Sequence, residues 1–209
     1  MKPFLKVSGT AFAMREDDIN TDLIAPLSMA RVLNPDYADL LFKRRRVDEK
    51  GKRIPEHPLN QERFREVSIF LGGRNFGCGS GREAAVWCLA AIGVRCVVSR
   101  GFADLFRENC LQGGVLPIVL QDPDANRLED AVLMANGRAP FSVDLSAQSI
   151  TGPGDLKISF HISASDRTRL LEGLDAIGLT LRYEDEIGNW ERRTLAQRPW
   201  MQAFRDKRL

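Results

Sequence analysis

The sequence predicts an α/β protein whose central part alternates strands and helices. Three short apolar runs, at residues 67–73, 94–99 and 115–120, are rich in β-branched residues and have the length of buried strands. Residues 80–93 and 102–114 have helical composition, separate these runs and end at glycines. This strand–helix–strand–helix–strand order is typical of a parallel sheet with right-handed crossover connections.

The segments before this central part are less regular. Residues 4–13 have the composition of a strand. Asn34 followed by Pro35 is a common helix start, and we expect that helix to extend to residue 42. Residues 43–66 are highly charged and contain a glycine and two prolines, so they predict a long exposed loop.

The segments after the central part predict a helix, a hairpin and further helices. Residues 122–137 have a helical pattern. Residues 141–151 and 156–163 alternate apolar and polar side chains on either side of a Gly-Pro-Gly turn, which indicates a hairpin. Residues 164–194 predict one or two helices that end the fold.

The composition is that of a globular protein. Of the 209 residues, 44% are hydrophobic and 28% are charged, and the formal net charge of +2 gives no strong field to attract nucleic acid. We expect a single domain at residues 1–196, with the charged loop 43–66 exposed, and a loosely held C-terminal tail at residues 197–209. No segment has the roughly 20 apolar residues of a membrane span, so we expect a cytoplasmic protein.

The four cysteines and two histidines do not have the spacing of a metal site. The sequence contains neither a Cys-x-x-Cys pair nor a matching pair of histidines. This chain is therefore not expected to bind a metal by itself. Cys88 and Cys96 lie in apolar runs, and we expect them to be reduced and buried.

A glycine-rich turn at residues 72–82 joins the first central strand to the following helix. Such a turn directs free backbone N–H groups and the positive end of the helix dipole at one spot, which favours an anionic ligand. The turn lacks the Gly-Lys-Ser/Thr of a phosphate-binding loop and the acidic partner of a dinucleotide fingerprint. Arg82 can bind a carboxylate through two nitrogen atoms, and Ser80 offers a hydroxyl beside it.

The local pattern leaves two roles open for Ser80. Ser80 and Glu83 have the spacing of a capping box, in which the serine hydroxyl bonds to the backbone N–H of Glu83 and the Glu83 carboxylate returns to Ser80. The local pattern alone favours this capping role. Arg82 is electrostatically unfavourable at the start of a helix, which indicates a purpose other than stability, although it could also be a surface arginine.

The same turn resembles that of a known family. Residues 73–83 read Gly-Arg-Asn-Phe-Gly-Cys-Gly-Ser-Gly-Arg-Glu, and small subunits of 3-isopropylmalate dehydratase, in the aconitase family, have Ser-Ser-Arg in place of Ser-Gly-Arg. Similar segments are spread over nearly the whole chain, at residues 20–22, 99–104, 109–110, 114–117 and 173–180. The resemblance implies a swivelling three-layer β/β/α domain, as in the aconitase C-terminal domain.

The resemblance also implies a shared active site. It implies a heterodimer or larger assembly, with a separate large subunit, that interconverts 2- and 3-isopropylmalate by dehydration and rehydration in leucine biosynthesis. The large subunit would carry the 4Fe-4S cluster, one iron of which takes the leaving hydroxyl. Ser80 would then be the base that removes a proton next to a carboxylate, Arg82 would hold a substrate carboxylate, and Asp22 would support the charge network.

The chain departs from the family pattern in two places. Gly81 stands at a substrate-binding position where the family has a second serine, and residues 34–38 replace a loop that helps to select the substrate side chain. A related hydratase acting on another substituted malate, such as citramalate or dimethylmalate, is therefore an alternative. Arg31 is a candidate for a second substrate-binding arginine or, equally, a solvated surface residue.

The basic run at residues 43–53 suggests a function of another class. Cationic clusters bind RNA phosphates, and some aconitase relatives also regulate RNA. The acidic residues interspersed in this run favour a solvated loop instead. The expected partners are therefore the large subunit and a small dicarboxylate, and neither a membrane nor a nucleic acid is expected.

Overall fold

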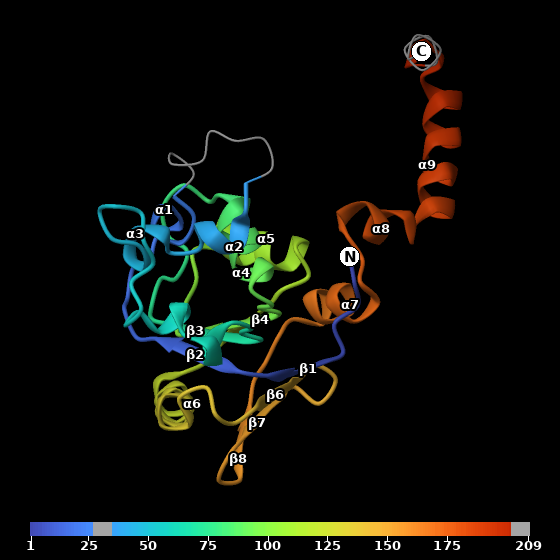
Figure 1. Cartoon of the computed structure of the whole chain (residues 1–209). Coiled ribbons are helices and arrows are strands. Elements are labelled where there is room, and N and C mark those ends of the chain that lie inside the picture. Colours follow the sequence, from blue (N-terminus) through green and yellow to red (C-terminus); the bar gives the residue numbers. More distant parts are fainter. Residues whose placement is uncertain (27–34, 202–209) are drawn as a thin grey trace. The chain divides into compact units, whose positions relative to one another are not determined.

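The structure is a computed structural model that describes residues 1–26 and 35–201 (Figure 1). Its contacts divide the chain into two units, Met1–Gly173 and Leu174–Leu209. No helix in the described part of the chain is long and apolar enough to cross a membrane.

The larger unit contains a four-stranded parallel sheet with the strand order β2, β3, β4 and β5, in which helices α4 and α5 connect the last three strands. The bounds are β2 Ala11–Met14, β3 Ile69–Gly72, β4 Cys96–Ser99, β5 Leu116–Val119, α4 Glu83–Ala91 and α5 Asp104–Gln112. Every residue of β3 and β4 is buried, as expected for strands covered on both faces. The predicted α/β core is confirmed.

An antiparallel sheet forms a second layer, with the strand order β1, β6, β7 and β8. The bounds are β1 Lys6–Gly9, β6 Phe141–Asp144, β7 Ser149–Gly152 and β8 Leu156–Ser159. Figure 1 shows this sheet on the side of the parallel sheet that is opposite α4 and α5.

Two predictions of single strands are wrong. The stretch at residues 4–13 forms β1 and β2, which belong to different sheets, because the chain leaves one sheet at Gly9 and enters the other at Ala11. The stretch at residues 141–151 forms both β6 and β7. The Asp144 carboxylate accepts a hydrogen bond from the backbone N–H of Ala147 (2.8 Å), which stabilises a turn between these strands.

The side chains of the parallel sheet alternate between two cores. Ile69 and Leu71 of β3 pack in a cluster that includes Val143 of the antiparallel sheet. Phe70, between them, packs in a second cluster that includes Leu89 of α4. The antiparallel sheet, the parallel sheet and the helices are therefore three successive layers, which confirms the predicted β/β/α architecture.

The other helices described within residues 1–26 and 35–173 lie around these layers. They are α1 Thr21–Ile24, α2 Tyr37–Leu40, α3 Lys43–Arg46, α6 Asp122–Ala135 and α7 Ala164–Glu172, with short 3-10 helices at Pro58–Asn60 and Glu62–Phe64. The N-cap of α2 is Asp36, whose carboxylate accepts hydrogen bonds from the backbone N–H groups of Ala38 (3.0 Å) and Asp39 (3.1 Å). Asn34, which we expected as the cap, lies outside the described residues.

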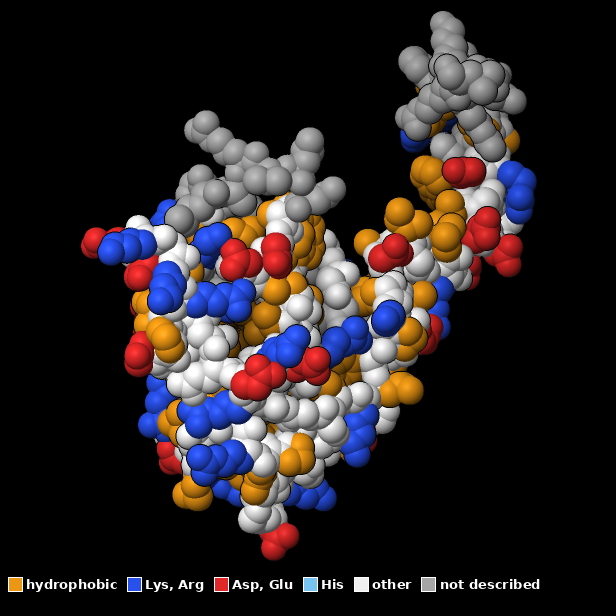
Figure 2. Space-filling model, viewed as in Figure 1, with side chains coloured by type: hydrophobic (Ala, Val, Ile, Leu, Met, Phe, Trp, Pro, Cys, Tyr) orange, Lys and Arg blue, Asp and Glu red, His pale blue; other side chains and the backbone are white. Residues whose placement is uncertain are grey.

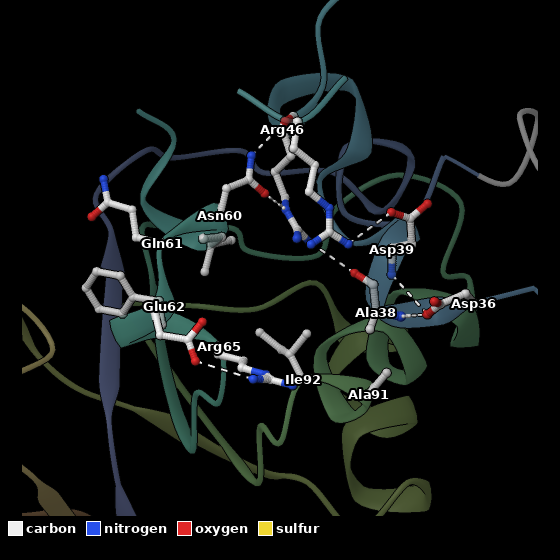
Figure 3. A pocket seen from close by; sticks show the side chains of 13 residues that line it. Asp36, Ala38, Asp39, Arg46, Asn60, Gln61, Glu62, Arg65, Ala91 and Ile92 are labelled. Carbon is white, nitrogen blue, oxygen red and sulfur yellow. Dashed lines mark hydrogen bonds and ion pairs between the residues drawn. The ribbon is translucent and has the colours of Figure 1, made fainter. Parts of the chain in front are cut away.

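The charged segment at residues 43–66 is attached to the larger unit through Arg46. Arg46 is 6% exposed, and its guanidinium donates to Asn60 Oδ1 (2.9 Å) and to the backbone oxygens of Ala38 (3.0 Å) and Leu41 (3.1 Å) (Figure 3). Burial lowers the pKa of Arg46 from its ordinary value, because removing the cation from water disfavours the charged form. The segment thus combines an exposed charged surface with a buried anchor.

Replacing Arg46 by methionine is expected to lower the free energy of unfolding by about 2–3 kcal/mol. The change leaves two backbone carbonyl groups without their donor, and each such group costs about 1–3 kcal/mol, partly offset by removing a buried cation. The exposed Arg65, paired with Glu62, provides the matched control, because Arg65→Met should change stability by less than about 0.5 kcal/mol. Urea unfolding measures both variants, and equal effects would contradict the anchoring role.

The described residues of the smaller unit form α8 (Ala176–Leu181), α9 (Glu184–Gln197) and a 3-10 helix at Pro199–Met201. With α7, residues 164–194 thus contain three helices rather than one or two. The separation arises because Gly173 ends α7 in the left-handed conformation and the Asp175 carboxylate caps α8. The predicted limits of domain and tail, residues 1–196 and 197–209, stay a prediction.

Candidate active site

The ends of three parallel strands bring three segments of chain together. β2 leads to α1, β3 leads into the glycine-rich turn at residues 72–82, and β4 leads to α5. The backbone N–H of Thr21 donates to the carbonyl of Cys78 (2.8 Å), and that of Phe76 donates to the carbonyl of Gly101 (3.0 Å). These bonds join the three segments at the carboxyl edge of the sheet, where α/β proteins commonly bind their ligands.

The predicted capping role of Ser80 is wrong. Helix α4 begins at Glu83, three residues later than expected, and its N-cap residue is Arg82. Gly81 has a φ of +63° and turns the chain between Ser80 and the helix. The Ser80 side chain is exposed at the end of the turn, where its hydroxyl is accessible to a ligand.

The Ser80 hydroxyl is held by a residue to which the sequence analysis gave no role. Ser80 Oγ and Thr21 Oγ1 are 3.1 Å apart, within hydrogen-bonding distance. Thr21 is fully buried in the first turn of α1, and Asn20 caps that helix by accepting from the backbone N–H of Leu23 (2.8 Å). Thr21 therefore provides a fixed partner for an exposed serine.

The same two segments also meet through a pair of charges. Arg82 Nη1 forms an ion pair with Asp22 Oδ1 next to the serine–threonine contact. The side chains of Arg82 and Asp22 are 36% and 50% exposed, so this pair is open to solvent. Thr21 and Asp22 of α1 thus contact Ser80 and Arg82, which brings the predicted site residues Ser80, Arg82 and Asp22 together, while their roles stay a prediction.

Gly81 occupies a position where a side chain would not fit without movement. A Cβ atom added to Gly81 would lie 2.6 Å from Cδ1 of Leu105 in α5. The Asn109 amide, also from α5, donates to the Gly81 carbonyl oxygen (2.8 Å). The packing of α5 therefore disfavours a side chain at this position unless Leu105 moves.

Replacing Gly81 by serine is expected to lower the free energy of unfolding by about 2 kcal/mol. Left-handed backbone costs a residue other than glycine about 1–2 kcal/mol, and the contact with Leu105 adds to this. Gly154 is the matched control, because its φ of +64° is nearly the same and its Cβ position is open. Thermal unfolding should show a larger loss for Gly81→Ser than for Gly154→Ser. Leu105→Ala removes the contact at Cδ1 but keeps the one at Cβ (2.9 Å), so it should reduce the difference, and a difference that it leaves unchanged would exclude the Cδ1 contact as the cause.

The last predicted site residue, Arg31, lies outside the described residues. Its role as a second substrate-binding arginine stays a prediction.

The cysteines of the chain are unsuited to hold an iron–sulfur cluster. Burial raises the pKa of the Cys88 thiol to about 12 and raises that of Cys96 well above its ordinary value, so both are neutral thiols in the core. Cys78 is partly exposed, and its thiol donates to the backbone oxygen of Asp18 (3.3 Å). Within residues 1–26 and 35–201, no group of three or more Cys, His, Asp or Glu side chains is placed to bind a metal.

A cavity of about 420 Å³ lies apart from Ser80, between α2, the end of α4 and the charged segment (Figure 3). Its charged lining residues are of both signs: Asp36, Asp39, Arg46, Arg53, Glu62 and Arg65. In Figure 3 the Arg46 and Asn60 side chains bond to each other at its wall. The cavity thus adjoins the contacts that attach the charged segment.

The basic run at residues 43–53 is engaged in ion pairs with the rest of the fold. The pairs are Lys43 with Asp39 (2.8 Å), Arg45 with Glu16 (2.6 Å) and Arg53 with Asp39 (3.5 Å). Figure 2 shows basic and acidic side chains interspersed over this face of the larger unit. Such pairing supports the interpretation of a charged surface over that of an RNA-binding cluster.

Two family models match the chain, one over its N-terminal part and one near its C-terminus. Residues 1–123 match the family model of the aconitase C-terminal domain. Residues 177–204 match the model of the C-terminal domain of 3-isopropylmalate dehydratase small subunits. The first match contains Asp22, Ser80 and Arg82, so the fold and the site together define an aconitase-type β/β/α domain.

Similar proteins align over nearly the full chain. The 3-isopropylmalate dehydratase small subunit of Rhizobium meliloti (strain 1021) is 41% identical over 201 residues, which are 96% of this chain and 100% of that protein. The small subunit of Parvibaculum lavamentivorans is 38% identical over 202 residues, with the same coverage of both chains. The chain belongs to the family of 3-isopropylmalate dehydratase small subunits.

A solved structure shares the fold. The crystal structure of 3-isopropylmalate dehydratase from Methanocaldococcus jannaschii superposes with a TM-score of 0.62 at 22% identity and covers 90% of this chain and 99% of its own. At this identity the similarity supports the β/β/α architecture alone.

Proposed function

We propose that this chain provides one side of the active site of a 3-isopropylmalate dehydratase, with Ser80 as the base and Arg82 as the ligand of a substrate carboxylate. The observation that carries this proposal is the arrangement on α1 and the glycine-rich turn. An exposed serine hydroxyl lies 3.1 Å from a buried threonine hydroxyl, and an arginine two residues further on pairs with the aspartate next to that threonine.

Proton abstraction by a serine requires stabilisation of its alkoxide. The Thr21 hydroxyl is placed to donate to Ser80 Oγ, and Thr21 is buried, so it keeps its position as charge develops on the serine. The N-terminus of α4 begins three residues after Ser80 and adds the positive end of a helix dipole. Ser80 would take the proton from the carbon next to a carboxylate and return it in the hydration step.

Arg82 would orient the substrate. A guanidinium binds a carboxylate through two parallel N–H···O bonds, which fixes the carboxylate in the plane of the fork. Asp22 pairs with Arg82 now and would orient it when a substrate carboxylate is present. The acidic proton next to that carboxylate would then face Ser80.

The large subunit would provide the other side of the site, and the two subunits would form a heterodimer or a larger assembly. In this proposal the large subunit binds the 4Fe-4S cluster, since three of the four cysteines of this chain are buried and the described residues contain no group of side chains placed to bind a metal. The cluster supplies a Lewis acid for the departing hydroxyl group. The substrate is 2- or 3-isopropylmalate, which are small hydroxy-dicarboxylates.

The test is an anaerobic reconstitution of the two subunits. The chain is purified with its large subunit, and 3-isopropylmalate, citramalate and dimethylmalate are supplied separately while the unsaturated acid is followed by ultraviolet absorbance. We expect turnover of 3-isopropylmalate to exceed that of the other two acids. An assembly with an intact cluster that leaves 3-isopropylmalate unchanged would refute the proposed substrate.

A further inference from the structure

Six large apolar side chains of residues 174–201 are not buried among the described residues. We call them together the C-terminal apolar face: Ile177, Leu181, Tyr183, Ile187, Trp190 and Trp200. Ile177 is 69% exposed and Trp190 is 59% exposed. Figure 2 shows hydrophobic side chains gathered along α8 and α9. Exposed apolar groups of this size commonly mark a protein interaction site.

The two large exposed apolar side chains of α9, Ile187 and Trp190, lie on one side of the helix. Ile187 and Trp190 are three residues apart, and Tyr183 lies one turn before Ile187, which is the spacing of an amphipathic helix. Asp185 and Ala196, by contrast, lie on the opposite side of the helix. Every described residue of α8 and α9 lies at least partly at the surface, so these helices contain no core of their own.

The acidic residues in the first turn of α9 stabilise the helix, and they are not part of the C-terminal apolar face. Glu184, Asp185 and Glu186 lie in its first turn, where acidic residues interact favourably with the helix dipole. Isolated helices of this length are marginal in water, so packing of the apolar side against another surface is the expected source of further stability.

The partner can be inferred from what the two matched regions of the chain contain. The match to the aconitase C-terminal domain, residues 1–123, contains all the described residues of the proposed site. The second match, residues 177–204, contains the whole C-terminal apolar face and is to a domain named for the dehydratase small subunit. This segment recurs in separate small subunits, contains no described residue of the proposed site and exposes apolar side chains. Such a segment is suited to binding a partner protein.

We propose that the C-terminal apolar face docks on the large subunit of the dehydratase. This inference rests on the proposed function, because that function requires a large subunit. Trp190 and Ile187 would be the central anchors, since large apolar and aromatic side chains in the middle of an interface contribute most to affinity.

The test compares three full-length variants, Ile187→Glu, Trp190→Glu and Ala196→Glu, in binding to the purified large subunit by biolayer interferometry. Ile187→Glu and Trp190→Glu place a charge on the apolar face and should raise Kd by about 30-fold or more. Ala196→Glu places the same charge on the opposite side of the helix and should change Kd by less than about threefold. Circular dichroism checks that the three variants retain equal helix content.

Turnover separates this proposal from the proposed function. With the large subunit in saturating excess, Ile187→Glu and Trp190→Glu should regain the kcat of the unmodified chain, because the face is not part of the chemistry. If the subunits bind and the variants weaken binding, but 3-isopropylmalate does not react, then docking stands and the proposed function fails.

Three results would overturn the docking proposal. One is a Kd that stays within threefold for both Ile187→Glu and Trp190→Glu. Another is an equal loss of affinity for Ala196→Glu, which would indicate an effect of charge alone. The third is self-association of the chain that the two variants abolish while Kd for the large subunit is unchanged, which would assign the face to a second copy.

Discussion

Ser80→Ala is expected to lower the kcat of the assembled dehydratase by about 10²–10⁴-fold, the range that a positioned general base contributes. The variant removes the hydroxyl that receives the substrate proton and leaves the Thr21 hydroxyl without its partner. The substrate carboxylate would still bind to Arg82, so KM should change little. Steady-state kinetics with the large subunit in excess measures both constants.

The structure also predicts what Ser80→Ala leaves intact. Because α4 is capped at Arg82 rather than at Ser80, the variant removes no helix cap, and the free energy of unfolding should fall by only about 1 kcal/mol through the lost hydrogen bond to Thr21. Ser165→Ala, at an exposed serine of α7, is the matched control and should keep full activity. A loss of stability with unchanged kcat would contradict the catalytic role and restore a structural one.

Arg82→Lys is expected to lower kcat/KM by about 10–100-fold, mainly through a higher KM. Lysine keeps the positive charge but loses the planar fork, and one hydrogen bond to a charged group contributes about 1.5–3 kcal/mol. Arg82→Met, which removes the charge as well, should have a larger effect. Substrate titration of the assembled enzyme distinguishes the two variants.

The ion pair with Asp22 supplies the control for Arg82. Asp22→Asn keeps the arginine and weakens its orientation, so its loss of kcat/KM should be smaller than that of Arg82→Met. Arg65→Lys, at an exposed arginine paired with Glu62, should have no effect on turnover. Equal kcat/KM for the unmodified enzyme and Arg82→Met would show that Arg82 only balances the charge of Asp22.

The central sheet could be predicted because its signals are local. The apolar runs that form β3 and β4 are buried throughout, and the run that forms β5 is buried except at Val119, so each is a continuous apolar stretch in the sequence. The chain passes from one sheet to the other after Gly9, and the sequence there contains no local signal of this change. Both halves of residues 4–13 have strand composition, and only their partners, far along the chain, decide to which sheet each belongs.

The site could be predicted in part, through the resemblance of its turn to a known family. The prediction of a capping box was wrong although Ser80 and Glu83 have its spacing. Gly81 between them adopts a left-handed conformation, and the spacing of residues does not reveal this. Thr21 and Asn109 were not assigned roles because their contacts to Ser80 and Gly81 cross 59 and 28 residues of chain. Such contacts depend on the assembled ends of three strands.

The pairing of β1 with β6 has a consequence for synthesis on the ribosome. The backbone oxygen of Val7 accepts a hydrogen bond from the hydroxyl of Ser142, 135 residues later, and the N-terminal ammonium donates to the carbonyl of Gly173 (2.8 Å). The parallel sheet needs only the chain up to β5, whereas β1 must wait for a strand made much later. We therefore expect the nascent chain to build its parallel layer first and to enclose its own N-terminus last.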